Sequence, residues 1–191
     1  LRAQRNSAIT PVRIDVTDRD CIAAAADFMQ SRIGDRGLSG LVNNAGIVVA
    51  GPLEALPLDA LRRQFEVNVI GQLAVTQALL PLLRKARGRI VNIGSIAGRV
   101  PLPFVAPYAM SKSALAAMTA ALRMEVAAWG IEVALIEPGA IATPIWRKSS
   151  AAADDLKQAM QPATWSLYAE QLARVRERVA EVEKHAIAAD A

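Results

Sequence analysis

The chain has 191 residues, of which 53% are hydrophobic and 21% charged, a balance typical of one globular domain. No uninterrupted apolar stretch is long enough to span a bilayer, and the single cysteine excludes an intrachain disulfide. Aromatic residues make up only 4% of the chain and do not alternate with basic ones, which argues against nucleic-acid binding despite the net charge of +4. We therefore expect a cytoplasmic protein with no membrane span and no nucleic-acid partner. No metal site is predicted, because Cys21 and His185 have no companions at metal-ligand spacing.

The first half of the chain alternates predicted strands with predicted helices. A short strand is expected at residues 12–16, followed by a helix that Thr17 caps and that ends near Gly34. The segment SGLVNNAG at 39–46 predicts a second strand that ends in small and amide residues. A long helix is then expected from Asp59 to about residue 83.

The second half continues the alternation as far as residue 139. GRIVNIGS at 88–95 and IEVALIEPG at 131–139 are apolar, β-rich runs, and the pattern between them predicts a helix at about 108–129. Such alternation predicts a parallel sheet covered by helices on both faces, with ligands at the carboxyl ends of the strands. After Pro144 no strand is predicted, and an amphipathic helix packed on the body is favoured over a coiled-coil partner.

Ser95, Tyr108 and Lys112 form the motif that carries the most chemistry. Tyr108 and Lys112 are four residues apart, so in a helix they lie on one face with the ammonium beside the phenol. A lysine charge about 4 Å away favours the phenolate by about 4 kcal/mol at an effective dielectric near 20. That is enough to bring a tyrosine pKa from about 10 to about 7. Ser95 closes a predicted strand, where its hydroxyl can orient a carbonyl or alcohol oxygen against Tyr108.

Together with NNAG at 43–46 and EPGAIATP at 137–144, this triplet resembles the short-chain dehydrogenase/reductase family over about residues 11–148. The surrounding sequence is similar to the branch that acts on retinoids, sterols and other hydrophobic alcohols. The resemblance implies a Rossmann-like, doubly wound parallel sheet in a three-layer α/β/α arrangement. It also implies an NAD(P)-dependent oxidoreductase that interconverts a secondary or hydrophobic alcohol and its carbonyl.

The resemblance also implies roles for individual residues. Tyr108 would be the general acid/base, Lys112 would lower its pKa and hold the nicotinamide ribose, and Ser95 would orient the substrate. Asn68 would support a proton-relay water; alternatively, it is a buried asparagine bonded to a neighbouring carbonyl, and both interpretations can hold together. Asp15 would accept from the adenine amino group, with an ordinary loop carboxylate as the alternative. The residues implied to bind NAD or NADP are Asp15, Val16, Asn44, Ala45, Gly46, Tyr108, Lys112, Pro138, Gly139, Ile141 and Thr143.

The family pattern is incomplete in this sequence. The family's first two strands, with the glycine-rich turn that binds the pyrophosphate, and its last strand are missing. We therefore expect a single truncated dinucleotide-binding domain over residues 1–191, with 145–191 as a helical substrate lid. Two interpretations stay open: a part of an active enzyme, or a catalytically inactive fragment that acts as an interaction or vestigial protein.

The resemblance further implies a homodimer or homotetramer. Family members usually pair through the helices that correspond to residues 59–83 and 108–129, and the second of these is rich in alanine. The alternative is that the alanines only pack this helix onto its own sheet.

Overall fold

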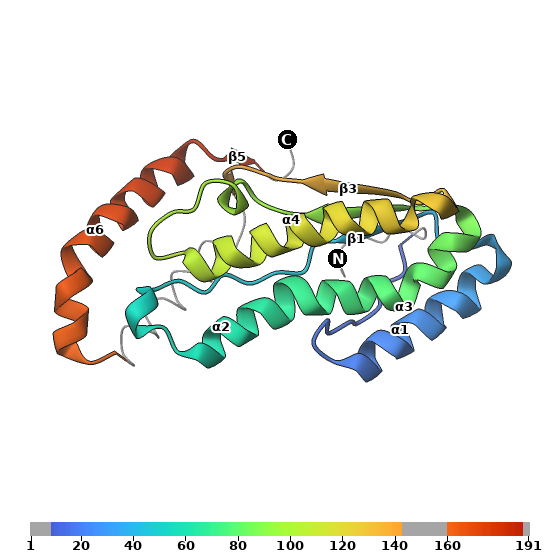
Figure 1. Cartoon of the computed structure of the whole chain (residues 1–191), viewed down its shortest axis with the longest axis horizontal. Coiled ribbons are helices and arrows are strands. Elements are labelled where there is room, and N and C mark those ends of the chain that lie inside the picture. The colour runs from blue at the N-terminus through green and yellow to red at the C-terminus, as the bar shows by residue number, and fades with distance from the viewer. Residues whose placement is uncertain (1–8, 143–159, 189–191) are drawn as a thin grey trace.

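The computed structural model describes residues 9–142 and 160–188, and its centre is a parallel three-stranded sheet (Figure 1). The strands β1 (Gly40–Asn43), β2 (Arg89–Ile93) and β3 (Glu132–Ile136) lie side by side in that order. Gly40 is paired with Arg89, and Arg89 is paired with Glu132. The predicted α/β class with a parallel, incomplete Rossmann-like sheet is confirmed.

The helices that connect the strands pack on one face of this sheet. The chain moves from β1 to β2 to β3 in one direction, and right-handed crossovers then place each connecting helix on the same side. On that side Ile90 and Val133 are buried, whereas Val42 and Ile136 on the other side are 62% and 50% exposed. The described residues thus contain one helical layer of the layered fold. Its helices are α1 (Arg19–Ile33), α2 (Leu58–Phe65), α3 (Gly71–Ala86) and α4 (Ala106–Val126).

The core lies between this helical layer and the sheet. Removing these side chains from water is the main stabilising contribution, at about 25 cal/mol for each Å² of apolar surface. The buried cluster consists of Ile22, Val75, Leu79, Leu82, Leu83, Ile90, Leu122, Val126, Ile131 and Val133.

The predicted strand at 12–16 is not formed in the structure. A strand is defined by hydrogen bonds to a neighbour, and neither sheet of the described residues includes this segment. Val12 and Ile14 are consequently exposed. The following helix is capped by Asp18 and not by Thr17: the Asp18 carboxylate accepts from the backbone N–H groups of Asp20 and Cys21.

The predicted long helix is present but is interrupted at its middle. Between α2 and α3 lies a single π-helical turn, η3 (Glu66–Ile70), with Asn68 at its centre. Residues Leu58–Ala86 are long and apolar enough, at a mean hydropathy of 1.3, to cross a membrane by composition alone. In this structure the packing of Val75, Leu79 and Leu83 in the core accounts for that apolar character.

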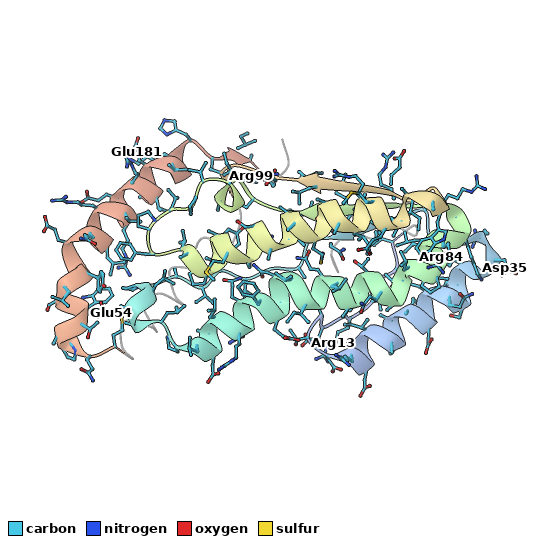
Figure 2. All side chains as sticks on the ribbon, viewed as in Figure 1. Arg13, Asp35, Glu54, Arg84, Arg99 and Glu181 are labelled. Atoms are coloured by element: carbon cyan, nitrogen blue, oxygen red, sulfur yellow. The ribbon has the colours of Figure 1, made fainter. Side chains whose placement is uncertain are left out.

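The C-terminal part contains the helix α6 (Pro162–Lys184), which lies at one end of the molecule (Figure 1). The Tyr168 hydroxyl on α6 is hydrogen-bonded to Glu54, which Figure 2 labels near α6. The Tyr168 ring meets the Phe104 ring edge-on at 6.1 Å between centroids. The two-residue strands β4 (Ile141–Ala142) and β5 (Ile187–Ala188) form a small parallel sheet that was not predicted. The short 3-10 turns are η1 (Gly34–Arg36), η2 (Leu53–Ala55), η4 (Ile96–Gly98) and η5 (Ala127–Trp129).

Candidate active site

Most of the predicted site residues gather at the edge of the sheet where the parallel strands end. Asn44, Ala45 and Gly46 follow β1, Ser95 follows β2, and the turn at 137–140 follows β3. The backbone of these ends is tied together, because the Gly94 N–H donates to the Ile136 carbonyl at 2.7 Å. This is the edge where ligands bind in open parallel sheets.

Tyr108 and Lys112 lie on the first turns of α4, as their spacing predicts. Pro107 is fixed in the conformation that a helix start requires. The Lys112 side chain is buried, at 5% exposed, and its Nζ donates to the Ile93 carbonyl at 2.7 Å. The same Nζ lies 5.6 Å from the centre of the Tyr108 ring. The end of β2 therefore fixes the position of the ammonium.

The pKa of Tyr108 is shifted in the direction opposite to the one that the sequence predicted. Burial raises the pKa of the phenol, and a hydrogen bond from Ser95 opposes this without reversing it. Burial also lowers the pKa of Lys112 to about 8. The sequence-based argument counted the lysine charge but not the cost of removing a phenolate from water, and burial is the largest cause of the shift in the Tyr108 pKa.

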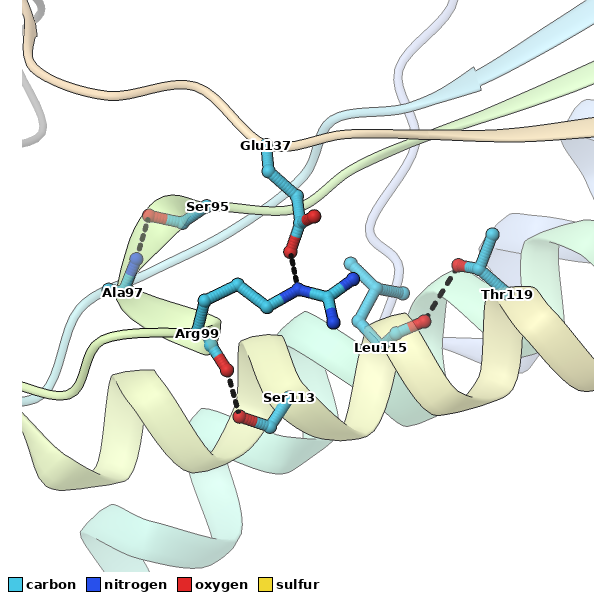
Figure 3. A network of polar contacts seen from close by, with 8 residues as sticks. Ser95, Ala97, Arg99, Ser113, Leu115, Thr119 and Glu137 are labelled. Carbon is cyan, nitrogen blue, oxygen red and sulfur yellow. Dashed lines mark hydrogen bonds and ion pairs between the residues drawn. The ribbon is translucent and has the colours of Figure 1, made fainter.

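Ser95, which is hydrogen-bonded to Tyr108, belongs to a group of polar contacts between the end of β2 and α4. Figure 3 shows these contacts around Ser95, Arg99 and Ser113. The Ser95 Oγ accepts from the Ala97 N–H at 3.2 Å and so caps the turn η4. Ser113 of α4 donates to the Gly98 carbonyl at 2.6 Å. On the other side, Arg99 pairs with Glu137 at 2.8 Å.

Asn68 is completely buried and fully bonded. Its Nδ2 donates to the Ile47 carbonyl at 3.1 Å and to Ser111 Oγ at 3.0 Å, and its Oδ1 accepts from the Ile47 N–H at 2.9 Å. The interpretation as a buried asparagine bonded to a neighbouring carbonyl is therefore confirmed. A relay water at this position stays a prediction.

A second polar row crosses the sheet beneath the site, and the sequence did not predict it. Asn43 Nδ2 donates to Thr76 Oγ1 at 2.9 Å and to Asn92 Oδ1 at 2.8 Å. Asn92 Nδ2 in turn donates to Thr119 Oγ1 at 2.8 Å. The row links α3, β1, β2 and α4. The available signal was an asparagine at the end of one apolar run and another within the next, which become cross-strand partners.

The predicted adenine-binding residues lie against the middle of the long helix. A Cβ atom at position 71 would lie only 2.5 Å from the Val16 carbonyl oxygen, so Gly71 permits this close approach. Asp15 is exposed, and its pKa is lowered mainly by hydrogen bonds from Thr17. An open hollow beside Asp15 is lined by Thr17, Arg62, Arg63, Glu66 and Val67.

The remaining predicted cofactor residues follow β3. Pro138 and Gly139 form the turn after that strand, and Ile141 begins β4. Among the described residues, apart from its two chain neighbours, no atom lies within 4 Å of a Cβ placed on Gly139. Thr143 lies outside the described residues.

The family profile described as short chain dehydrogenase matches residues 1–154 of this chain. The chain belongs to the short-chain dehydrogenase family. It is 39% identical over 175 residues to an NADPH-dependent 3-dehydrocapnine reductase of Ornithobacterium rhinotracheale, covering 89% of this chain and 59% of that protein. It is 44% identical over 140 residues to human 17-beta-hydroxysteroid dehydrogenase type 6, covering 73% of this chain and 44% of that protein. The chain thus spans about half the length of these relatives.

The fold of this short-chain dehydrogenase chain also resembles solved structures. The 3-ketoacyl-(acyl-carrier-protein) reductase from Brucella melitensis, complexed with NADH, superposes with a TM-score of 0.70 at 28% identity. That match covers 75% of this chain and 61% of the reductase. The hydroxysteroid dehydrogenase among the relatives agrees with the branch of the family that the sequence indicated.

The described residues of this dehydrogenase-family chain fit the two ends of a nicotinamide dinucleotide. Asn44, Ala45 and Gly46 are exposed at the strand edge, and Gly139 is exposed in the turn after β3 with no crowding by other described residues. An ammonium has three N–H donors. Lys112 directs one of them to Ile93, and no acceptor for the other two is found among the described residues. These two donors suit the hydroxyls of a ribose.

Proposed function

We propose that the protein is an NAD(P)-dependent oxidoreductase that interconverts a secondary or hydrophobic alcohol and its carbonyl. The observation that carries the proposal is the placement of Ser95, Tyr108 and a buried Lys112 at one strand edge, within a chain of the short-chain dehydrogenase family. When bound, a nicotinamide dinucleotide supplies or accepts the hydride. Lys112 and Tyr108 would hold its nicotinamide ribose, and Asn44, Ala45 and Gly46 would lie under its adenosine half.

The proton is the part of the reaction that the protein's own residues handle. In reduction, the Ser95 hydroxyl orients the carbonyl oxygen, and the Tyr108 hydroxyl gives its proton to that oxygen while the carbonyl carbon gains a hydride. The product is an alcohol, and Tyr108 is left as a phenolate beside the Lys112 ammonium. Since burial raises the pKa of Tyr108, the phenol is protonated at neutral pH and is ready to donate. Oxidation runs the same transfer backwards and requires the phenolate.

Lys112 is mainly cationic at neutral pH. A pKa of about 8 leaves roughly nine-tenths of the side chain protonated at pH 7. Its charge then offsets the negative charge that forms on Tyr108 as the proton leaves. We infer that Asn68 supports a water through which a proton from solvent returns to this pair after each turnover.

A hydrophobic substrate is supported by the residues that precede Tyr108. Leu102, Phe104 and Val105 lie between the end of η4 and the start of α4, and Leu102 is exposed. Phe104 has a left-handed backbone (φ of 64°), and its carbonyl accepts from the Gly51 N–H at 2.6 Å. This bond holds the backbone of Phe104 in a conformation that a residue other than glycine rarely adopts. The name of the human relative, a hydroxysteroid dehydrogenase, points to the same substrate class.

The competing proposal is a catalytically inactive protein that keeps the triplet without binding a dinucleotide. The two are separated by titrating the protein, expressed from its complete coding sequence, with NADH and NADPH while following nicotinamide fluorescence. Saturable binding together with turnover of a hydrophobic ketone supports the enzyme. Absence of binding at millimolar cofactor supports the inactive protein.

Ser95→Ala with Ser166→Ala as its control tests whether the proposed site performs the turnover. Both variants lose one hydroxyl, but Ser166 is exposed on α6 and bonds only within its own helix. Turnover is expected to fall at least tenfold in Ser95→Ala and to stay unchanged in Ser166→Ala. Equal rates in the two variants would reject the assignment of Ser95.

Homo-oligomer formation and a cytoplasmic location are further proposals. Ala117, Ala121 and Met124 are exposed on α4 and offer a flat face for a second copy. Light scattering after size-exclusion chromatography measures the mass, and a dimer or tetramer is the expected result. A monomer at micromolar concentration would refute it.

A further inference from the structure

A row of three buried amides runs along the long helix. Gln64, Asn68 and Gln72 are spaced four residues apart, and they are 0%, 0% and 1% exposed. Because the helix is interrupted by the π turn at 66–70, the row passes from α2 through η3 to α3. Glutamine is mostly found exposed in proteins, so two fully buried ones beside Asn68 need an explanation.

All three amides bond to the backbone of one segment, residues 45–49, which belongs to no strand. Gln72 Nε2 donates to the Ala45 carbonyl at 2.6 Å. Gln64 Nε2 donates to the Ile47 carbonyl at 2.8 Å, and its Oε1 accepts from the Val49 N–H at 2.7 Å. Asn68 accepts from the Ile47 N–H and donates to the Ile47 carbonyl. The three side chains thus bond to alternate residues of the segment, as a neighbouring strand would.

The π turn explains how a helix can follow an extended segment in this way. Four helical residues rise about 6 Å, which is close to the advance of about 6.6 Å over two extended residues. In a regular α-helix, however, each step of four residues overshoots a full turn by about 40°, and the row would rotate away from the segment. A π turn takes up one extra residue. The inserted turn at 66–70 therefore keeps Gln64 and Gln72 on the same face as Asn68.

The segment held by this row lies between the two halves of the proposed site. Asn44, Ala45 and Gly46 are the proposed adenosine-side residues, and a Cβ atom on Gly46 would lie 4.0 Å from Lys112 Nζ. Asn68 also bonds Ser111, whose Oγ donates to the Tyr108 carbonyl at 2.7 Å. A displacement of residues 45–49 would therefore disturb both the cofactor-binding backbone and the surroundings of Lys112.

We propose that Gln64 and Gln72 are positioning residues that hold residues 45–49 in the geometry required for dinucleotide binding. This inference rests on the proposed function. Gln72 gives the reason to look beyond stability, because its buried Oε1 has no hydrogen-bond partner among the described residues. An unpartnered buried acceptor lowers stability. A methionine at position 72 would fill a similar volume and would bury no unpartnered acceptor. What the amide at position 72 adds is its bond to Ala45.

The test compares Gln72→Met with Gln77→Met. Gln77 is exposed on the same helix, so the control makes the same chemical change away from the segment. In the protein expressed from its complete coding sequence, Gln72→Met is expected to raise the Kd for NADH and NADPH at least tenfold. It is also expected to raise the KM for cofactor more than it lowers kcat, with an unchanged or higher Tm. Gln77→Met is expected to match the wild type. A Kd within twofold of the wild type in Gln72→Met would overturn the proposal.

Hydrogen exchange tests the same inference without cofactor. In Gln64→Met the Val49 N–H loses its acceptor, so its exchange is expected to be at least tenfold faster than in the wild type, with α4 amides unchanged. Equal exchange at Val49 would overturn the positioning role. If the wild type binds neither dinucleotide, the proposed function fails, while this exchange result still decides whether the row holds the segment. Gln72→Asn, whose amide is too short to reach Ala45, replaces Gln72→Met if the latter does not fold.

Discussion

Replacing Lys112 by methionine is expected to stabilise the protein while abolishing its activity. The pKa of Lys112 falls from 10.5 in the unfolded chain to about 8 in the folded one, which corresponds to about 3 kcal/mol at about 1.36 kcal/mol for each tenfold change. The variant loses the hydrogen bond to the Ile93 carbonyl, worth about 1 kcal/mol. At pH 7 the net gain in the free energy of unfolding is therefore about 2 kcal/mol.

The stability difference between Lys112→Met and the wild type is expected to shrink as the pH rises. Below pH 8 both states carry the charge, so the full cost of burying it is present in the wild type. Between pH 8 and 10.5 the unfolded chain binds more protons than the folded one, and wild-type stability rises relative to the variant. The advantage of Lys112→Met should fall to about 0 kcal/mol at pH 10.

Urea denaturation of Lys112→Met and the wild type at pH 7 and pH 10 measures the difference in the free energy of unfolding at each pH. Lys85→Met is the matched control, because Lys85 pairs with Asp35 at the surface and is 40% exposed. Its removal should change stability by at most about 1 kcal/mol, to a similar extent at both pH values. A destabilised Lys112→Met at pH 7, or a difference that does not depend on pH, would refute the reasoning.

Three further outcomes are expected. Asn92→Ala interrupts the buried row between Asn43 and Thr119 and should lower the free energy of unfolding by about 2–3 kcal/mol in urea denaturation, whereas exposed Gln77→Ala should stay within about 0.5 kcal/mol. Gly71→Ala places a methyl 2.5 Å from the Val16 carbonyl oxygen and should cost about 1–3 kcal/mol, whereas a methyl at Gly139 meets no atom of the described residues beyond its chain neighbours within 4 Å. Equal stabilities of the two variants would argue against this close approach. Carbonyl reduction should slow above pH 8, where Lys112 loses its charge, whereas alcohol oxidation should speed up because the Tyr108 phenol must first lose its proton. The pH profiles of kcat in both directions check this. A reduction profile that stays flat to pH 10 would contradict it.

Local sequence patterns were sufficient to predict β1, β2 and β3 and the helices between them. The strands are apolar runs with glycine or proline nearby, and the spacing of Tyr108 and Lys112 already placed both on one helical face. The segment at 12–16 has the same local pattern but is not a strand, because strand formation depends on a neighbour that local patterns do not specify.

The supports of the site were not predictable in the same way. Gln64 and Gln72 are residue types that usually face solvent, and their partners at 45–49 are close only in the folded chain. The direction of the Tyr108 pKa was missed for a related reason, since desolvation depends on what the fold packs around the phenol. Sequence spacing identified the reactive groups, whereas their environment required the structure.

The most direct test of the proposed function is the rate of NADPH or NADH oxidation with a hydrophobic ketone in Tyr108→Phe and in the wild type, at saturating cofactor. Loss of the phenolic proton donor should reduce kcat by about 10²–10⁴-fold, and nicotinamide fluorescence should show that the variant is still saturated with cofactor under the assay conditions. Turnover by Tyr108→Phe at the wild-type rate would contradict the assignment of Tyr108, and a wild type that neither binds cofactor nor turns over ketone would contradict the oxidoreductase itself.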